Sequence, residues 1–294
     1  MKNILIPADF SDRTSFSLAA ALPLAGDDAQ INLLHAVEVV RNMPFLVTGE
    51  YVPITDEETH FNMELIRKGK DTLHQWVDRE SRRLGNGSVR MKGTLRVGYA
   101  AETILDYIRQ WGADLVVMGA HENPRHVYPL TGTLNDRIIR KASCPVLTIR
   151  ESPKEEGFRT IVYATAMEQE EMPMAHVVRQ IADRSAAVVH VVRINTPEDF
   201  QRDESVIGFM KTFIQDAGFA HHTLNTYNDL TVEDGILNFG RTVGADLVAM
   251  VTHGRGPVSR LLSGSVAEGI VAQSKVPILT QLVGRTRPVA GRKD

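Results

Sequence analysis

Cysteine is almost missing from this sequence, in which Cys144 is the single example among 294 residues. One cysteine forms no intrachain disulfide and supports no multi-cysteine metal site, which fits a reducing compartment. Cys144 lies in the segment ASCPVLTI, beside an apolar stretch. We therefore expect a buried, inert thiol.

Long apolar runs and an excess of one charge are missing too. No run approaches the about 20 residues that span a bilayer, and the opening MKNILIPADF lacks the apolar stretch of a secretory leader. The formal net charge is -3, which argues against a surface that wraps nucleic acid. We expect a soluble, cytoplasmic protein with no membrane or nucleic-acid partner.

What the sequence does contain is an internal repeat. GADLVVMGAH (Gly112–His121) and GADLVAMVTH (Gly244–His253) agree at seven of ten positions, 132 residues apart. The same offset aligns SCPVLTI with KVPILTQ, and near the start ILIPADF (Ile4–Phe10) lies opposite IVYATAM (Ile161–Met167), 157 residues apart. The sequence therefore predicts two copies of one domain.

We place the first repeat at residues 1–150 and the second repeat at residues 158–283, joined by the linker ESPKEEGF and followed by a basic tail at residues 284–294. The first repeat is longer because of an insertion at about residues 41–57, within the segment Arg41–Phe61. Proline, glycine and threonine in this segment predict a loop or flap.

Short apolar runs alternate with longer helical patterns in both repeats, which is typical of a parallel sheet covered on both faces. In the first repeat we expect helices at Asp12–Ala25, Thr55–Leu84, Ala101–Trp111 and Gly132–Lys141. The expected strands are Asn3–Ile6, Ile31–Val37, Val89–Arg96, Asp114–Met118, Val146–Ile149, Thr160–Tyr163, Ala187–Arg193, Ala220–Asn225, Asp246–Met250 and Ile278–Leu282. The predicted fold class is α/β, with two tandem five-stranded doubly wound parallel-sheet domains of the Rossmann-like kind.

The segment THGRGPVSRLLSGS (Thr252–Ser265) follows the apolar run ADLVAMV directly. Glycines allow close approach of main-chain amides, and a helix that opens at Gly264 and Ser265 directs free amides and a positive dipole end to one point. In open parallel sheets, ligands bind beyond the carboxyl ends of the strands. The segment therefore favours an anion, and phosphate above all.

The pattern Gly, two residues, Gly, nine residues, Gly and then Ser or Thr, after a strand such as ADLVVMG, resembles the nucleotide loop of the universal stress protein family. ILIPADFSDRTSFSLA (Ile4–Ala19) is similar to that family's first strand and helix, and CPVLTIR and VPILT are similar to its closing strand. The resemblance covers nearly the whole chain twice. It implies a tandem protein of that family, which includes ATP-binding members and members that bind no nucleotide.

For the second repeat the resemblance implies a phosphate site at the amides of Gly264, Ser265 and Val266, assisted by the Ser265 hydroxyl and by Arg255. Val251 replaces the pattern's first glycine, and Ala166 replaces an aspartate that lies near the adenosine. Main-chain contacts from Ala164 to Ala166 would remain. The full expected set is Ala164, Thr165, Ala166, Val191, Met250, Val251, His253, Gly254, Arg255, Gly264, Ser265 and Val266.

For the first repeat the resemblance implies a weaker site, because Glu122 replaces the second glycine and a carboxylate repels a triphosphate. Prolines in the following NPRHVYPLT also remove donor amides. The expected set is Pro7, Ala8, Asp9, Val37, Met118, Gly119, Gly132 and Thr133.

Catalytic and metal-binding patterns are lacking elsewhere. The sequence has no G-x-S-x-G elbow and no Walker loop ending in Gly-Lys-Ser, so at most slow ATP hydrolysis with Mg²⁺ is expected. His35 and His190 are interpreted as equivalent strand residues and not as metal ligands. We interpret the acidic segment Glu168–Pro173 as a solvated helix start.

Three functions remain open. The first is a stress-response protein that binds ATP, or a related adenine nucleotide, mainly in the second repeat. The second is a scaffold that binds no nucleotide and acts through domain pairing, and the third is a carrier of small apolar or anionic molecules. Since closing strands of this family pair edge to edge, the resemblance implies an internal pseudo-dimer and allows a homodimer.

Overall fold

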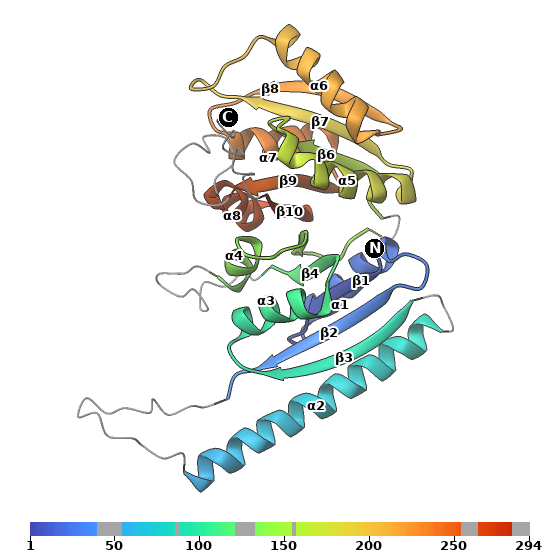
Figure 1. Cartoon of the computed structure of the whole chain (residues 1–294), viewed down its shortest axis with the longest axis vertical. Coiled ribbons are helices and arrows are strands. Elements are labelled where there is room, and N and C mark those ends of the chain that lie inside the picture. The colour runs from blue at the N-terminus through green and yellow to red at the C-terminus, as the bar shows by residue number, and fades with distance from the viewer. Residues whose placement is uncertain (40–54, 86–88, 121–132, 155–156, 254–263, 284–294) are drawn as a thin grey trace, which may run out of the picture. The chain divides into compact units, whose positions relative to one another are not determined.

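The computed structural model describes residues 1–39, 55–85, 89–120, 133–154, 157–253 and 264–283. The residues in these ranges divide into two compact units, Met1–Met118 and Gly119–Asp294. Strands and helices alternate along both, as the sequence predicts (Figure 1). No helix in the described ranges is long and apolar enough to cross a membrane.

The sheet of the first unit has the order β3-β2-β1-β4, and β1 pairs in parallel with β2 and β4, as β2 does with β3. Its strands are β1 (Asn3–Pro7), β2 (Gln30–Val37), β3 (Arg90–Val97) and β4 (Leu115–Gly119). Ile4, Leu5 and Ile6 are fully buried. This agrees with helices on both faces of the sheet, which leave a central strand no polar side.

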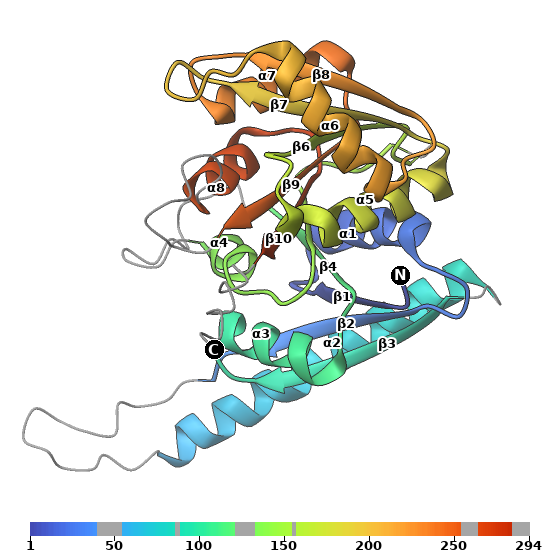
Figure 2. The same ribbon diagram turned by 45° about the horizontal axis from the view of Figure 1, so that its top comes forward.

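The helices of the first unit are α1 (Asp12–Ala21), the 3₁₀ turn η1 (Leu22–Leu24), α2 (Asp56–Leu84) and α3 (Ala100–Trp111). Helix α2 lies along β2 and β3, as both ribbon views show (Figures 1 and 2). Gly93 of β3 allows this approach, because a Cβ there would lie 2.9 Å from Leu73 of α2.

The sheet of the second unit has the order β5-β10-β9-β6-β7-β8. Its strands are β5 (Val146–Ile149), β6 (Thr160–Ala164), β7 (Val188–Asn195), β8 (His222–Asn228), β9 (Leu247–His253) and β10 (Ile278–Val283). All pairings are parallel except that of β5 with β10, which is antiparallel. The two closing strands of the repeats therefore lie edge to edge.

The helices of the second unit are α4 (Leu134–Ile139), η3 (Gln169–Glu171), α5 (Met172–Ser185), α6 (Asp203–Ala217), α7 (Val232–Val243) and α8 (Gly264–Gln273). Helix α5 packs against α6, and α7 packs against α8. In this sheet β7 and β8 lie on one side of β6, and β9 and β10 lie on the other. This is the arrangement of a doubly wound sheet, in which the strand order reverses next to the first strand.

The compact units and the repeats do not end at the same residue. The closing strand β5 comes from the first repeat, yet it belongs to the second unit because it pairs with β10. The boundaries at residues 150 and 158 therefore describe the duplication in the sequence, and they remain a prediction.

The end of the segment Arg41–Phe61 overlaps the start of helix α2. Residues 40–54 lie outside the described ranges, whereas residues 56–61 are already helical. Thr55 caps α2: its hydroxyl accepts from the Glu58 amide at 3.2 Å, and its own amide donates to the Glu58 carboxylate at 2.9 Å. This capping box fixes the helix start and agrees with the helix expected from Thr55. The last residues of the predicted insertion, up to about residue 57, therefore belong to α2 and its cap.

Candidate functional site

The candidate residues of the second repeat that lie on strands meet at the carboxyl ends of β6, β7 and β9. Ala164 lies opposite Val192 on β7 and opposite Met250 on β9. Met250, Val251 and Val191 have no exposed surface. Because their side chains are part of the core, these residues can contact a ligand only through main-chain groups.

The turn after β6 has an internal partner that the sequence did not reveal. The amide of Ala166 donates to Glu171 Oε1 at 3.1 Å, and the Thr165 hydroxyl donates to the other carboxyl oxygen. The amide of Thr165 donates to the Val192 carbonyl at 3.1 Å. The amides of Thr165 and Ala166, which we expected to contact adenosine, are thus both satisfied within the protein.

Glu171 is fully buried, so the predicted solvated helix start is wrong at this residue. Burial raises the pKa of Glu171 to about 7, although the hydrogen bonds from Thr165 and Ala166 oppose the increase. The Tyr163 hydroxyl donates to the main-chain carbonyl of Glu171 at 3.3 Å, which fixes η3 against β6. The buried carboxyl group of Glu171 therefore binds the turn that follows β6.

A small cavity lies at the same end of the sheet. Its lining comes from the turn after β6, the end of β7 and the first turns of α7, namely Ala164, Thr165, Ala166, Val192, Arg193, Ile194, Val232 and Ile236. About 20 Å³ is open to the centre of a water molecule, which is room for one or two waters.

The predicted phosphate end is described only at its flanks. Strand β9 continues to His253, and α8 begins at Gly264 and Ser265, followed by the half-buried Val266. Gly254 and Arg255 lie outside the described ranges. The backbone thus has the strand and the helix start that the phosphate prediction needs, on the two sides of the glycine-rich segment.

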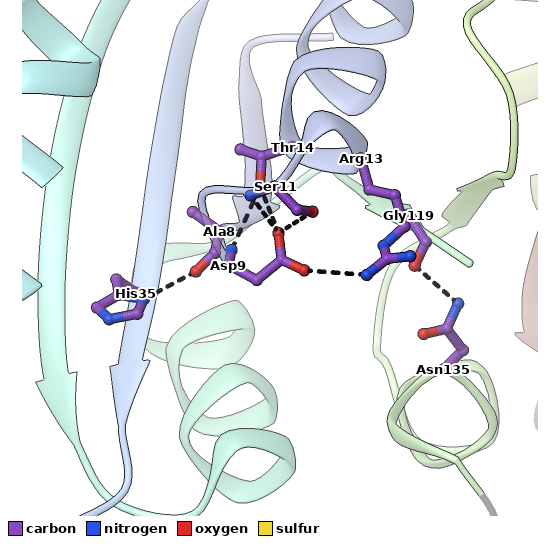
Figure 3. A network of polar contacts seen from close by, with 8 residues as sticks. All are labelled: Ala8, Asp9, Ser11, Arg13, Thr14, His35, Gly119 and Asn135. Atoms are coloured by element: carbon purple, nitrogen blue, oxygen red, sulfur yellow. Dashed lines mark hydrogen bonds and ion pairs between the residues drawn. The ribbon is translucent and has the colours of Figure 1, made fainter. Parts of the chain in front are cut away.

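In the first repeat, Asp9 follows β1 directly and its carboxylate organises the turn into α1 (Figure 3). Its Oδ1 accepts from the Ser11 amide at 3.0 Å, the Ser11 hydroxyl at 2.6 Å and the Thr14 hydroxyl at 2.9 Å. Burial alone would raise the pKa of Asp9, but these hydrogen bonds and the charge of Arg13 lower it. Asp9 stays ionised, with 44% of its side chain exposed.

Neighbouring first-repeat candidates are held by main-chain contacts. The amide of Ala8 donates to the Leu34 carbonyl at 2.9 Å, and the Ala8 carbonyl lies 2.8 Å from His35 Nδ1 (Figure 3). The Val37 carbonyl accepts from the Gly98 amide at 3.0 Å. Pro7 closes β1, and Met118 is buried in β4.

The remaining first-repeat candidates precede or begin α4. The Gly119 carbonyl accepts from Asn135 Nδ2 at 3.1 Å (Figure 3). The Thr133 amide donates to the Asp136 carboxylate at 2.7 Å, and the Thr133 hydroxyl accepts from the Asp136 amide. A carboxylate therefore already accepts from the amide of Thr133, a residue of the expected first-repeat site. Gly132 and Glu122 lie outside the described ranges.

The strand register corrects the equivalence of two histidines. Asn32 lies opposite Leu5, and His190 lies opposite Val162, which is the repeat partner of Leu5. His190 therefore matches Asn32. The match to His35 is Arg193, because the bonds from Ala8 to Leu34 and from Thr165 to Val192 are equivalent. The similar strings LLHAV and VVHVV suggested an alignment that is three residues out of step.

Sequence reasoning missed two functional candidates, Glu171 and Arg193, both of which are nearly or fully buried. Glu171 lies in an acidic run typical of a solvated helix start, so its sequence gives no sign of burial. Arg193 interrupts the apolar run of β7. A charged residue inside a strand that is covered on both faces indicates a buried cation, and this pattern could have identified Arg193 from the sequence. No group of three or more His, Cys, Asp or Glu within the described ranges could hold a metal ion.

Comparisons with known proteins give a consistent result. The model of the universal stress protein family matches residues 1–150 and 229–280. Universal stress protein MJ0531 of Methanocaldococcus jannaschii is 26% identical over 155 residues, covering 52% of this chain and 85% of that protein. MJ0577 of the same organism is 24% identical over 153 residues, covering 51% and 94%.

A solved universal stress protein from Archaeoglobus fulgidus has a similar fold along almost all of its length. It covers 97% of this chain and 98% of its own, with a TM-score of 0.73 and 15% sequence identity. This likeness extends over both repeats and fits two tandem Rossmann-like domains.

Proposed function

Since the chain belongs to the universal stress protein family, we propose that it binds an adenine nucleotide, ATP with Mg²⁺, mainly in its second repeat. One observation carries the proposal: β9 ends at His253 and α8 begins at Gly264, so a strand end and a helix start flank the glycine- and hydroxyl-rich segment. A helix N-terminus that follows such a segment favours phosphate.

The adenosine end of this site is weaker than its phosphate end. Ala166 has no carboxylate to offer, and its amide already donates to Glu171. A nucleoside that uses this amide must displace the Glu171 carboxyl group, which costs about one hydrogen bond, 0.5–1.5 kcal/mol. We therefore expect a modest affinity for ATP and at most slow hydrolysis.

The role that follows is regulatory and cytoplasmic. Nucleotide binding would fix the segment between β9 and α8 and so change a surface that partners contact, as a ligand with unequal affinity for two states does. An internal pseudo-dimer is part of the proposal, and the antiparallel pairing of β5 with β10 supports it.

The experiment is calorimetric titration of the full chain with ATP and Mg²⁺. We expect saturable binding that Gly264→Val abolishes, because a branched side chain at the helix start obstructs the amides. Gly208→Val on α6 is the matched control, since a Cβ at Gly208 meets no atom within 4 Å. Absence of binding at millimolar ATP, or equal binding by Gly264→Val, would refute the proposal.

A scaffold that binds no nucleotide is the second candidate. The observation in its favour is Glu171, which occupies the amide of Ala166 and is fully buried. This candidate predicts that the full chain purifies without adenine absorbance and gives no heat with ATP.

A further inference from the structure

Arg140 joins the two repeats through a forked ion pair. It is the C-cap residue of α4, which belongs to the first repeat, and its guanidinium binds Glu268 on α8 of the second repeat. Arg140 Nε donates to Oε1 of the carboxylate, and Nη2 donates to Oε2 at 2.5 Å. A guanidinium that makes two bonds to one carboxylate fixes the orientation of both groups. Each carboxylate oxygen of Glu268 therefore accepts from Arg140.

The fold brings these two side chains together within the second unit. Helix α4 packs against β5 and β10, and α8 packs against β10 as well. Arg150, which follows β5, holds the far end of α8, because its Nη2 donates to the carbonyls of Val271 at 3.2 Å and Ala272 at 2.6 Å. The side chains of Arg140 and Glu268 are 35% and 19% exposed, so solvent screens this pair less than it screens a surface pair.

The position of Glu268 in α8 suits it to cap the start of its own helix. The offset of 132 residues that aligns the repeats pairs Glu268 with Asp136 and Ser265 with Thr133. The sequence SVAE (Ser265–Glu268) has the spacing of a capping box, in which the carboxylate of the last residue accepts from the main-chain amide of the first. Glu268 is thus the acceptor that the sequence provides for the Ser265 amide.

The first repeat contains the same pair of positions in their capping arrangement. The Asp136 carboxylate accepts from the Thr133 amide at 2.7 Å. The charge of Asp136 also acts on Arg140, but the forked ion pair of Arg140 is made with Glu268. The second repeat has Ala272 where the first has Arg140, so it returns no such bond to Asp136. The carboxylate therefore caps the helix in one repeat and pairs with an arginine in the other.

The Ser265 amide is also one of the three that we assign to phosphate, with those of Gly264 and Val266. A carboxylate on this amide competes with phosphate in two ways, because it occupies the donor and places a negative charge beside the anion. Side chains of a helix tilt toward its N-terminus, and three residues span about 4.5 Å of the helix axis. Glu268 is therefore within reach of this amide whenever Arg140 does not hold it.

We propose that Arg140 keeps the start of α8 open for phosphate by holding the Glu268 carboxylate away from the Ser265 amide. This role rests on the phosphate part of the proposed function, and it gives a residue of the first repeat control over the affinity of the second. It also accounts for phosphate binding in the second repeat and not in the first, where Asp136 occupies the matching amide.

The first test is hydrogen exchange of the full chain without ligand, measured by NMR. In Arg140→Gln the carboxylate is released, so the Ser265 amide gains an acceptor and should exchange about fivefold more slowly than in the parent. Arg140→Gln combined with Glu268→Ala removes the acceptor as well and should restore the parent rate. Lys141→Gln removes an exposed cation one residue away and is the matched control, which should exchange as the parent does.

The second test is calorimetric titration of the same proteins with ATP and Mg²⁺, and with tripolyphosphate. Arg140→Gln should weaken binding of both anions by about tenfold. Lys141→Gln and the double variant should bind as the parent does, and Glu268→Ala alone should bind at least as tightly, because it lacks the competing carboxylate. An arginine that merely braced α8 would make Glu268→Ala as weak as Arg140→Gln, so that result would overturn the proposal.

The outcomes distinguish this proposal from the nucleotide proposal. Binding of tripolyphosphate but not ATP by the parent, with the expected effects of Arg140→Gln, would refute the nucleotide proposal alone. Binding of ATP by the parent, with unchanged exchange or unchanged affinity in Arg140→Gln, would refute the role of Arg140 alone, and binding of neither anion would refute both. If Arg140→Gln does not fold, Arg140→Lys, which keeps a cation but not the forked pair, takes its place in both tests.

Discussion

The amide of Ala166 donates to the buried carboxyl group of Glu171 at 3.1 Å. The first repeat has the equivalent bond, since the amide of Asp9 donates to the Thr14 hydroxyl at 3.3 Å. The two turns share their shape: Phe10 and Met167, 157 residues apart, both have positive φ angles, 61° and 65°. In the first repeat the carboxyl group of this turn belongs to Asp9, directly after the strand. In the second repeat it belongs to Glu171, at the start of the helix.

The first prediction concerns pH. The pKa of Glu171 is about 7 in the folded protein against 4.5 for the free group, so the folded state binds the proton more tightly. This contribution to stability is complete below pH 4.5 and is lost as the pH rises through about 7, by at most about 3 kcal/mol. The groups around Glu171 are Tyr163, Thr165 and Ala166, with the charge of Glu168 nearby.

Urea unfolding at about pH 5 and about pH 8 measures this effect. Glu171→Gln should reduce the difference in free energy of unfolding between the two pH values, because an amide does not titrate. Glu204→Gln, an exposed change on α6, is the control. If the Glu171→Gln protein keeps the full difference, the buried carboxyl group is not its source.

The second prediction compares two substitutions at Glu171 by ATP calorimetry. Glu171→Ala frees the Ala166 amide and should tighten ATP binding by about tenfold, the value of one hydrogen bond. Glu171→Gln keeps an acceptor for that amide and should bind ATP as the parent does. Equal affinities of both variants would show that nucleotide does not use this amide.

The third prediction concerns a buried polar contact in the first unit. Asn32 is fully buried, and its Nδ2 donates to the Tyr107 hydroxyl at 2.7 Å. Tyr107→Phe removes the acceptor and should lower the free energy of unfolding by about 1–3 kcal/mol. Tyr99→Phe, at a side chain 64% exposed, should change it by less than about 0.5 kcal/mol; a loss as large as that of Tyr107→Phe would contradict the account.

The fourth prediction concerns the start of α2. Thr55→Ala removes the acceptor for the Glu58 amide and should cost about 1 kcal/mol of local stability. Hydrogen exchange of the amides in the first turn of α2 should accelerate accordingly. Thr59→Ala, within the same helix and exposed, should leave these amides unchanged, and equal acceleration by both variants would count against the cap.

Much of the fold could be predicted because its signals are local. The near-continuous apolar runs of β1, β6 and β9 and the duplicated GADLV strings indicate the parallel strands and their order along the chain. Thr55 and Glu58 predict the start of α2 by their spacing. These features depend on residues within a few positions of one another.

The site was harder to predict because its partners depend on register. Arg193 matches His35 only once β7 is aligned against β6, and similar strings in β2 and β7 suggested another alignment. Glu171 is buried because η3 folds back under Thr165 and Ala166, which no periodicity in EQEEMP reveals. The partners of Glu171 and Arg193 lie five or six residues away in the chain, but the contacts depend on how the turn or loop folds back, which no periodic pattern indicates.

The pairing of β5 with β10 decides how this chain can be divided. The main-chain groups on one edge of each strand form hydrogen bonds with a strand from the other half of the sequence. Cutting the chain after residue 150 would leave β10 with a row of free N–H and C=O groups, which is a template for association with other chains. Fragments that contain one half are therefore expected to aggregate, or to recover a closing strand by recombining with the complementary fragment.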